Sequence, residues 1–326
     1  MSGNKANILG VVIDSTSASS VLNTIVGKAK GDVIASPSEV EGEAISSGTR
    51  PNNHGIASSQ APRNDNLVVF TPNPEFVVEA QADSDFKQLL NKADISLPDG
   101  IGLVWAGKLL GQTIKERISG ADMVEKLLEE GNRKPPFVRR FGGLRKGRQG
   151  TVNSHEGWKI GIVGARRGVI NEVEELIRRL GEKYPNITFV NLDNVIARNP
   201  ADSAGDEAIP NEMRLPRGKT PRNDRFHIVF ACHGMKKQEK WIWENKDKIS
   251  TNVFMGVGGS LDFLTGFTKR APKVMRRIGL EWLWRGIQRP GHWRRIWRAT
   301  VVFGGMVAKE LLTQRSKCKN QELIQN

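Results

Sequence analysis

Short apolar runs alternate along this chain with segments whose apolar residues recur at helical spacing. Runs typical of buried strands cover residues 8–13, 67–70, 95–97, 158–163, 227–231 and 253–256. Helical patterns follow several of them, at 101–110, 169–183 and 237–248. We expect Ser15 or Thr16 to cap the first helix, and Asn73 to cap a helix that begins at Pro74. This alternation predicts an α/β, Rossmann-like fold with a mainly parallel sheet flanked by helices.

Three polar stretches interrupt this pattern, at about 27–66, 131–157 and 199–225. The first contains no aromatic residue, and the second is strongly basic. Segments of this composition bury too little apolar surface to offset the entropy lost on ordering. We therefore expect flexible insertions in a catalytic domain that spans residues 1–266.

Residues 267–326 have a different character and predict a separate helical appendage. One apolar stripe at helical spacing is formed by Leu280, Leu283, Trp284 and Ile287. After Pro290 a second stripe begins with Trp293, Ile296 and Trp297, interleaved with Arg294, Arg295 and Arg298. Four of the eight tryptophans lie between Trp282 and Trp297, so this short region holds half of that residue type.

Charge is concentrated in the same region. The 326-residue chain has a net charge of +14, and its last 60 residues carry fourteen lysines and arginines against three acids. Tryptophan and arginine together on short helices suit a membrane interface, where rings lie at headgroup depth and guanidinium groups meet lipid phosphates. Two alternatives are packing of these helices on the core and binding of nucleic acid, although no nucleic-acid-binding fold is recognisable.

Composition excludes several classes of protein. The two cysteines, Cys232 and Cys318, are too few for a disulfide framework or a four-cysteine zinc site. No apolar run approaches the 18 residues of a membrane span, and residues 1–7 lack the pattern of a signal peptide. These features predict a cytoplasmic protein that is soluble or peripheral to a membrane.

Two polar clusters directly follow predicted strands, where sheets of this kind bind ligands. The first contains Thr71 and Asn73, and the second contains Asp99 and Gly100. Asp99 is either a turn or capping residue or a general base for an incoming hydroxyl. Arg117 is either a surface ion-pair partner or a ligand for a diphosphate, which its planar fork matches.

Glycines and polar residues after later strands give further candidates. Gly256, Gly258 and Gly259 would let backbone amides approach a phosphate, or would simply form a turn. The glycines at 161, 164 and 168 do not have dinucleotide-fingerprint spacing, and no matched acid follows them in the sequence. We expect neither Cys232 nor its neighbour His233 to be catalytic, since adjacent strand residues point to opposite faces.

Several longer motifs occur in one order: TPNPE (71–75), ADISLPDGIG (93–102), ERISGAD (116–122), KQEKW (237–241), GVGGSLDF (256–263), RAP (270–272) and GLEWLWR (279–285). Together they resemble the WecG/TagA/CpsF family of bacterial glycosyltransferases, which is glycosyltransferase family 26. The resemblance covers 8–26, 67–130, 158–198 and 226–300. The three polar stretches are insertions relative to that family.

The resemblance implies an inverting transfer from a UDP-sugar, typically UDP-N-acetylmannosamine, without a metal or other cofactor. The implied acceptor is an undecaprenyl-diphosphate-linked sugar at the inner face of the plasma membrane, in synthesis of a cell-surface polysaccharide. Asp99 would be the general base, with Thr71 and Asn73 in the same pocket, and Arg117 would stabilise the leaving diphosphate. The implied substrate-binding residues are Gly100, Asp122, Gln238, Glu239, Gly256, Gly258, Gly259 and Asp262.

The resemblance also implies that the appendage binds the membrane and closes over the active site. Its expected membrane-binding and site-completing residues are Arg277, Trp282, Trp284, Arg285, Trp293, Arg294, Arg295 and Trp297. At 232–239 the chain departs from the family, because Lys236 stands where proline is usual and adds a positive charge beside the pocket. Assembly is left open between a monomer and a homo-oligomer.

Two other functions are compatible with parts of the sequence. A nucleotide-binding oxidoreductase would use a similar sheet, but it would carry a dinucleotide fingerprint. A non-catalytic module that binds membrane or nucleic acid through its basic tail would not need Asp99 or Arg117, and both are present.

Overall fold

A parallel six-stranded sheet forms the centre of the protein. The computed structural model describes residues 5–31, 66–133, 157–193, 225–277, 279–288, 291 and 293–325. The strands of the sheet are β3 (Leu67–Phe70), β4 (Ile95–Ser96), β5 (Lys159–Val163), β6 (Thr188–Asn191), β7 (Phe226–Ala231) and β8 (Thr251–Gly256). Their order across the sheet is β4-β3-β8-β7-β5-β6, and every neighbouring pair is parallel. This architecture confirms the predicted α/β class.

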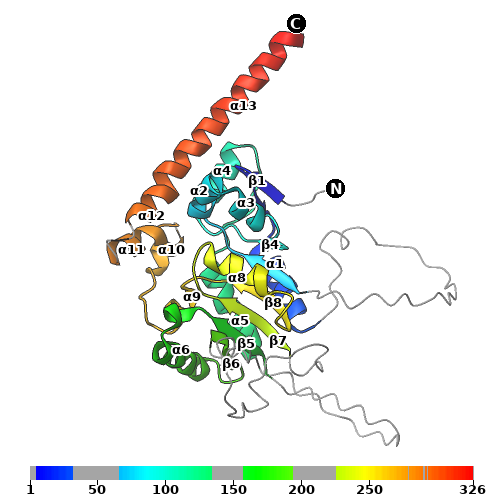
Figure 1. Cartoon of the computed structure of the whole chain (residues 1–326). Helices are drawn as coiled ribbons and strands as arrows, with labels where there is room; N and C mark the ends of the chain where they lie inside the picture. Colours follow the sequence, from blue (N-terminus) through cyan, green and yellow to red (C-terminus); the bar gives the residue numbers. More distant parts are fainter. Residues whose placement is uncertain are drawn as a thin grey trace, which may run out of the picture.

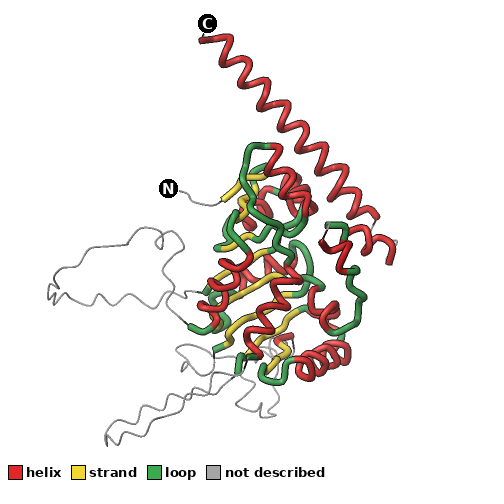
Figure 2. The backbone as a smooth tube through the Cα atoms, turned by 180° about the vertical axis from the view of Figure 1, so that it is seen from behind, coloured by secondary structure: helices red, strands yellow, loops and turns green. Residues whose placement is uncertain are grey.

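Helices cover both faces of the sheet, as Figure 2 shows from behind. One face packs against α1 (Ala18–Ala29), α5 (Gly120–Asn132), α6 (Ile170–Lys183) and α9 (Ser260–Leu264). The other packs against α2 (Pro74–Ala82), α3 (Ser84–Leu90), α4 (Ile101–Leu109) and α8 (Lys237–Asn245). Successive strand residues serve opposite faces: in β3, Val68 and Phe70 join the second layer while Val69 joins the first. The strands therefore read as continuous apolar runs because both faces are buried.

The sequence predicts one strand at residues 8–13, and this prediction is wrong. The segment belongs to a hairpin outside the main sheet. β1 (Lys5–Ile8) pairs antiparallel with β2 (Val11–Asp14). Leu9 and Gly10 form the turn, and both have positive φ, at 53° and 83°. The side chain of Asn7 holds this turn by accepting a hydrogen bond from the Gly10 amide at 2.7 Å. A two-residue turn with two positive φ values matches the twist of hairpin strands.

Of the two predicted helix caps, the first is wrong and the second is confirmed. Ser17, rather than Ser15 or Thr16, caps α1, with its hydroxyl accepting from the Ser20 amide. Asn73 caps α2 as predicted, since its side-chain oxygen accepts from the amides of Glu75 and Phe76. Most of the three expected insertions lies outside the described residues. Their predicted edges are too wide, because α1 extends to Ala29 and α5 to Asn132.

The C-terminal segment is helical, as predicted, and ends in one long helix. It begins with α10 (Lys273–Arg277) and α11 (Glu281–Gln288). A continuous helix then runs through α12 (Trp293–Trp297), a π-helical turn η5 (Arg298–Val302) and α13 (Phe303–Gln325). Phe303 and Val307 are buried in the same core as α2 and α4. Beyond them the side chains are mostly exposed, and α13 leaves the body of the protein (Figure 1).

Among the described residues, no helix combines the length and apolar character that crossing a lipid bilayer requires.

Candidate active site

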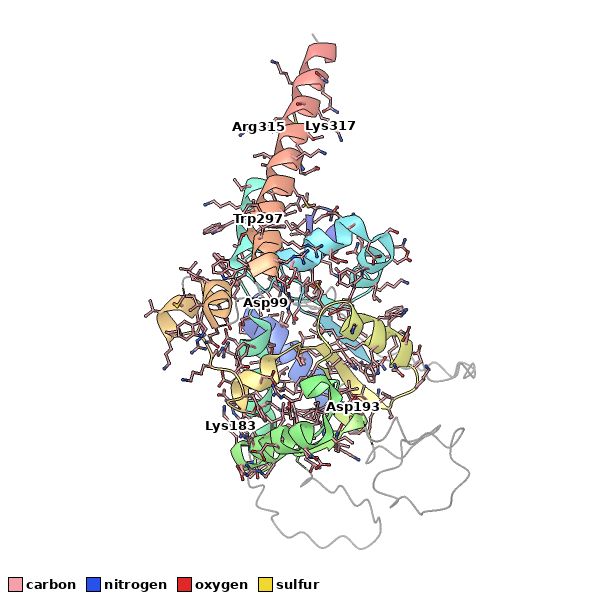
Figure 3. All side chains as sticks on the ribbon, turned by 60° about the vertical axis from the view of Figure 1, so that its left-hand side comes forward. Asp99, Lys183, Asp193, Trp297, Arg315 and Lys317 are labelled. Atoms are coloured by element: carbon pink, nitrogen blue, oxygen red, sulfur yellow. The ribbon has the colours of Figure 1, made fainter. Side chains whose placement is uncertain are left out.

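The loops that follow β3 and β4 meet at the carboxyl edge of the sheet. The Leu97 amide donates to the Phe70 carbonyl at 2.9 Å, and the Asp99 amide donates to the Pro72 carbonyl at 3.0 Å. Asp99 is half-buried and lies near the centre of the molecule in Figure 3. Gly100 follows with a φ of 122°, which residues with a side chain rarely adopt. This turn leads directly into α4. The hydrogen bond of its backbone amide thus anchors Asp99 at this edge of the sheet.

Arg117 is brought to the same loop by the segment before α5. The amide of Ile118, the residue after Arg117, donates to the Pro98 carbonyl at 3.0 Å. Arg117 therefore lies next to a direct backbone contact with the Asp99 loop. The guanidinium of Arg117 is half-buried and donates to the Arg276 carbonyl at 3.1 Å. This bond connects the Asp99 loop to α10, at the start of the C-terminal segment.

Thr71 and Asn73 lie beside these two residues but have structural bonds of their own. The buried Thr71 hydroxyl donates to the Gly256 carbonyl at 3.1 Å, so it joins the ends of β3 and β8. Gly120 packs closely on its other side, because an added Cβ would lie 3.2 Å from the Thr71 methyl group. The Asn73 side-chain oxygen accepts hydrogen bonds from the two amides that it caps.

The Asp122 carboxylate forms ion pairs with two arginines of the C-terminal segment, Arg270 and Arg276. It lies 2.5 Å from the Arg270 guanidinium and 3.6 Å from that of Arg276. Arg270 also pairs with Glu125 at 3.2 Å. Asp122 therefore holds positive charge beside Arg117, and a direct contact between this carboxylate and an anionic diphosphate would be unfavourable.

Gln238 and Glu239 are fully buried behind the glycine loop after β8. The Gln238 carbonyl oxygen accepts from the Gly258 amide at 3.0 Å, and its NH₂ group donates to Glu239 at 2.6 Å. The second Glu239 oxygen accepts from the Lys236 amide at 2.7 Å. Gly256 must lack a side chain, because an added Cβ would lie 2.8 Å from the Gln238 amide nitrogen. These two side chains therefore position the loop from within.

The glycine loop presents backbone to the open edge. Gly258 has a φ of 52°, and the exposed Gly259 precedes α9. Asp262, in the first turn of α9, lies 3.5 Å from the Arg166 guanidinium. Because the Gly258 amide already donates to Gln238, a phosphate contact through the backbone of this loop stays a prediction.

Lys236, the departure from the family pattern, is neutralised by acids. Its ammonium group lies 2.9 Å from Glu79 and 2.8 Å from Asp83, on α2 and at the start of α3. These pairs raise the pKa of Lys236 through hydrogen bonds with Asp83 and Glu79. The charge that the sequence adds here is thus directed at α2 and the start of α3.

Arg295 of the appendage binds the catalytic domain. Its guanidinium makes a bidentate pair with the buried Glu75, at 2.8–3.1 Å, two residues after Asn73. Arg298 pairs with Glu79 at 2.6 Å, one helical turn further along α2. These contacts fix the start of the long helix against the element that Asn73 caps.

The other predicted appendage residues differ in exposure. Trp293 and Trp297 are about half exposed, at 49% and 60%, and Arg294 is exposed next to them. Trp282 and Trp284 are half-buried, and the Trp284 indole donates to the Lys269 carbonyl at 3.3 Å. In the first predicted stripe, Ile287 is exposed at 62% instead of packing. The side chains of Arg277 and Arg285 lie outside what the structure describes.

Asp193 is a candidate that the sequence did not reveal. It follows β6, and its carboxylate oxygens accept from the Gly164 amide at 2.9 and 3.1 Å. The glycine spacing after β5 is still not that of a dinucleotide fingerprint, but the fold brings the Asp193 carboxylate to this glycine turn. Twenty-eight residues separate the two positions, and the separation is bridged by the βαβ unit of β5, α6 and β6.

Cys232 and His233 lie at the end of β7. Burial raises the pKa of the Cys232 thiol well above its ordinary value, and the charges of Asp262 and Asp193 raise it further. Burial also lowers the pKa of His233, although Asp193 opposes that effect. A thiol held protonated is a poor nucleophile, which is consistent with the expectation that Cys232 is not catalytic.

Within the described part of the chain, no group of three or more histidine, cysteine, aspartate or glutamate side chains is arranged to hold a metal ion.

The pH dependence of stability is expected to show the burial of Glu239. Desolvation raises the pKa of this carboxyl from 4.5 to about 7, so the folded protein retains a proton that the unfolded chain releases between those values. The contribution of Glu239 to stability is therefore complete below pH 4.5 and is lost as pH rises to about 7. Relative to Glu239→Gln, the wild-type protein should lose on the order of 2 kcal/mol between pH 5 and pH 8. Urea unfolding of both proteins measures this difference, and parallel pH profiles would contradict the assignment.

The pair of Arg295 and Glu75 is expected to stabilise the docked appendage. Arg295→Ala leaves the Glu75 carboxylate buried without its partner and should lower the free energy of unfolding by about 1–3 kcal/mol. Arg294→Ala removes the same charge from the neighbouring exposed position and should change stability by less than about 0.5 kcal/mol. In a double-mutant cycle, Glu75→Gln should recover part of the Arg295→Ala loss. Equal losses for the two arginine variants would show that only net charge matters.

Comparison with known proteins shows the family of this chain. Residues 52–146 and 150–317 match the model of the glycosyl transferase WecG/TagA/CpsF family. Curated relatives include N-acetylglucosaminyldiphosphoundecaprenol N-acetyl-beta-D-mannosaminyltransferases of Staphylococcus aureus. The protein of strain MW2 is 28% identical over 237 residues, and that of strain MRSA252 is 30% identical over 238 residues. Each alignment covers 73% of this chain and 77% of the relative. The chain therefore belongs to the WecG/TagA/CpsF family of glycosyl transferases.

Proposed function

We propose that this protein is an inverting glycosyltransferase that moves N-acetylmannosamine from a UDP-sugar to an undecaprenyl-diphosphate-linked N-acetylglucosamine. The product would serve synthesis of a bacterial cell-surface polysaccharide. Family membership supports sugar transfer, and the names of the S. aureus relatives supply the sugar and the acceptor class. The observation that carries the proposal is the joining of the Asp99 and Arg117 loops through the Ile118–Pro98 hydrogen bond.

The reaction needs one base and one site for departing charge. Asp99 would take the proton of the acceptor hydroxyl as its oxygen attacks the anomeric carbon. The bond from that carbon to the UDP oxygen breaks on the opposite face, so the configuration inverts. UDP leaves with the bonding electron pair, and Arg117 would stabilise the charge that develops on its diphosphate. The product is the elongated lipid-linked sugar, and the proton stays on Asp99 until solvent removes it.

Arginines near Arg117 support a diphosphate site that needs no metal. Arg270 and Arg276 flank it, both held by Asp122. The Nε atom of Arg276 is buried and lacks a hydrogen-bond partner within the described residues. That unsatisfied donor favours an anionic ligand, because a buried donor without a partner is costly. We propose that these guanidinium groups neutralise the diphosphate, the role that a divalent cation has in other transferases.

Exposed apolar and basic side chains support attachment to the inner face of the plasma membrane. Trp105 of α4 is exposed at 64%, and Trp297 lies on the long helix that contacts α4 through α13. Arg315 and Lys317 extend from the projecting part of α13 (Figure 3). Aromatic rings at headgroup depth with basic residues nearby match an anionic lipid surface. We propose peripheral binding at the surface where a lipid-linked acceptor is found.

Release of UDP tests the proposed activity. The full chain, bound to anionic vesicles, would be mixed with UDP-N-acetylmannosamine and a lipid-diphosphate N-acetylglucosamine acceptor. We expect UDP release that requires the acceptor and persists in EDTA. Loss of activity in EDTA that a divalent metal restores would contradict the metal-free diphosphate site. Folded, vesicle-bound protein that releases no UDP from a panel of UDP-sugars would instead favour the non-catalytic membrane-binding alternative.

A further inference from the structure

The sheet has a change of direction at β5 and β7, which is where such sheets bind ligands. From β5 the chain continues outward to β6, whereas from β7 it continues in the opposite direction to β8. The loops after β5 and β7 therefore diverge. Gly164, after β5, is buried, while His233, after β7, and Asp193, after β6, are half-buried. Neither the family motifs nor the roles of Asp99 and Arg117 use this position.

Gly164 is the centre of this position. It directly follows β5 and has a φ of 66°, and a methyl group added there would collide with the His233 ring from the loop after β7. On its other side the Gly164 amide donates to the Asp193 carboxylate. His233 Nδ1 is buried and has no hydrogen-bond partner in the described part of the chain. Two side chains that could bind a ligand thus converge on one glycine from two further strands.

We propose that Asp193 binds the ribose hydroxyls of the donor nucleotide, with the nucleoside lying against the half-buried Asp193 carboxylate beside the Gly164 turn. A carboxylate has about four acceptor positions, and the single Gly164 N–H occupies at most two of them. A ribose offers two adjacent hydroxyl donors. An acid at the end of the second strand of a βαβ unit, beside a glycine turn, has the placement by which nucleotide-binding sheets hold ribose.

Charge and distance assign the remaining parts of the donor. Asp193 would repel a diphosphate, so the uncharged ribose should be the part that it contacts. Four strand spacings separate β4 from β5, or about 19 Å. The reacting sugar at Asp99 and the nucleoside at Gly164 would then lie at opposite ends of an extended nucleotide-sugar. The diphosphate would cross the glycine loop after β8, which lies between them in the strand order.

Binding of deoxy analogues tests the assignment, which rests on the proposed use of a uridine nucleotide donor. Calorimetry of the full chain would compare UDP, 2′-deoxy-UDP and 3′-deoxy-UDP. The wild-type protein should bind UDP roughly 10-fold or more tightly than at least one deoxy analogue. Asp193→Ala should weaken UDP binding by a similar factor and remove this discrimination. Asp193→Asn, whose amide oxygen still accepts from Gly164, should discriminate less than the wild type.

Asp94→Ala and Asp94→Asn are matched controls. Asp94 also accepts a backbone hydrogen bond, from the Val68 amide at 2.8 Å, but it precedes β4 and so lies at the opposite edge of the sheet. Both control variants should bind and discriminate like the wild type. Equal binding of all three nucleotides by the wild type, or retained discrimination in folded Asp193→Ala, would overturn the assignment.

The same experiment separates this inference from the proposed activity. Discrimination that depends on Asp193 in a protein that transfers no sugar would uphold the ribose site and reject the transferase. Sugar transfer with unchanged kinetics and UDP affinity in Asp193→Ala would uphold the transferase and reject the ribose site. Folded wild-type protein that binds no UDP would overturn the uridine nucleotide donor and this assignment with it.

Discussion

Replacing Asp99 with asparagine is expected to lower the rate of sugar transfer about 10²- to 10⁴-fold, the range by which a positioned base accelerates a reaction. Asparagine keeps the size of the side chain, and it keeps the hydrogen bond from the backbone amide of residue 99 to the Pro72 carbonyl. The variant should therefore fold and bind UDP like the wild type. Single-turnover transfer and UDP binding, measured on the same preparation, separate these two effects.

Asp94→Asn provides the control for this variant. Asp94 and Asp99 flank the same short strand, β4, at opposite edges of the sheet. The control should transfer sugar at the wild-type rate. Asp99→Asn protein that retains most of its activity would exclude Asp99 as the base. Loss of UDP binding in that variant would show that its carboxylate organises the loop instead.

Most of the sheet could be predicted because its strands are buried on both faces. β3 and β8 are nearly continuous apolar runs, and such runs stand out in a sequence. β6, at the edge, was missed because its residues are only partly buried and its pattern is weak. The hairpin at the N-terminus was also missed, because its turn places the apolar Leu9 at positive φ, which a non-glycine residue seldom adopts.

The candidate site could be predicted only where motifs carried it. Asp99 and Arg117 belong to sequence motifs, and the structure joins their loops. Asp193 belongs to no motif, since its contact with Gly164 depends on how β5 and β6 pair. Arg295 and Glu75 are 220 residues apart, so their ion pair could not be inferred from local pattern.

In the appendage, the arginines and the tryptophans have different roles. The sequence grouped its arginines and tryptophans as one membrane surface. Arg295 and Arg298 instead form ion pairs with Glu75 and Glu79. The side chains of Trp293 and Trp297 remain exposed. Because Glu75 lies two residues after Asn73, docking of the long helix and the geometry of the candidate active site are physically connected. A membrane that binds the tryptophans would then hold that edge of the site close to a lipid-linked acceptor.

Replacing Arg117 with alanine is expected to lower kcat about 10²- to 10³-fold, because its charge would matter most as the diphosphate departs. The guanidinium is oriented by the Arg276 carbonyl, and Asp122 keeps two more arginines next to it. Arg117→Lys keeps the charge without the planar fork and should recover only part of the rate. Lys115→Ala, two residues earlier on the exposed side of the same loop, removes an equal charge and should leave kcat unchanged. Steady-state kinetics with the donor varied would distinguish these cases. Equal losses in Arg117→Ala and Lys115→Ala would mean that the general positive field, and not the placement of Arg117, stabilises the leaving group.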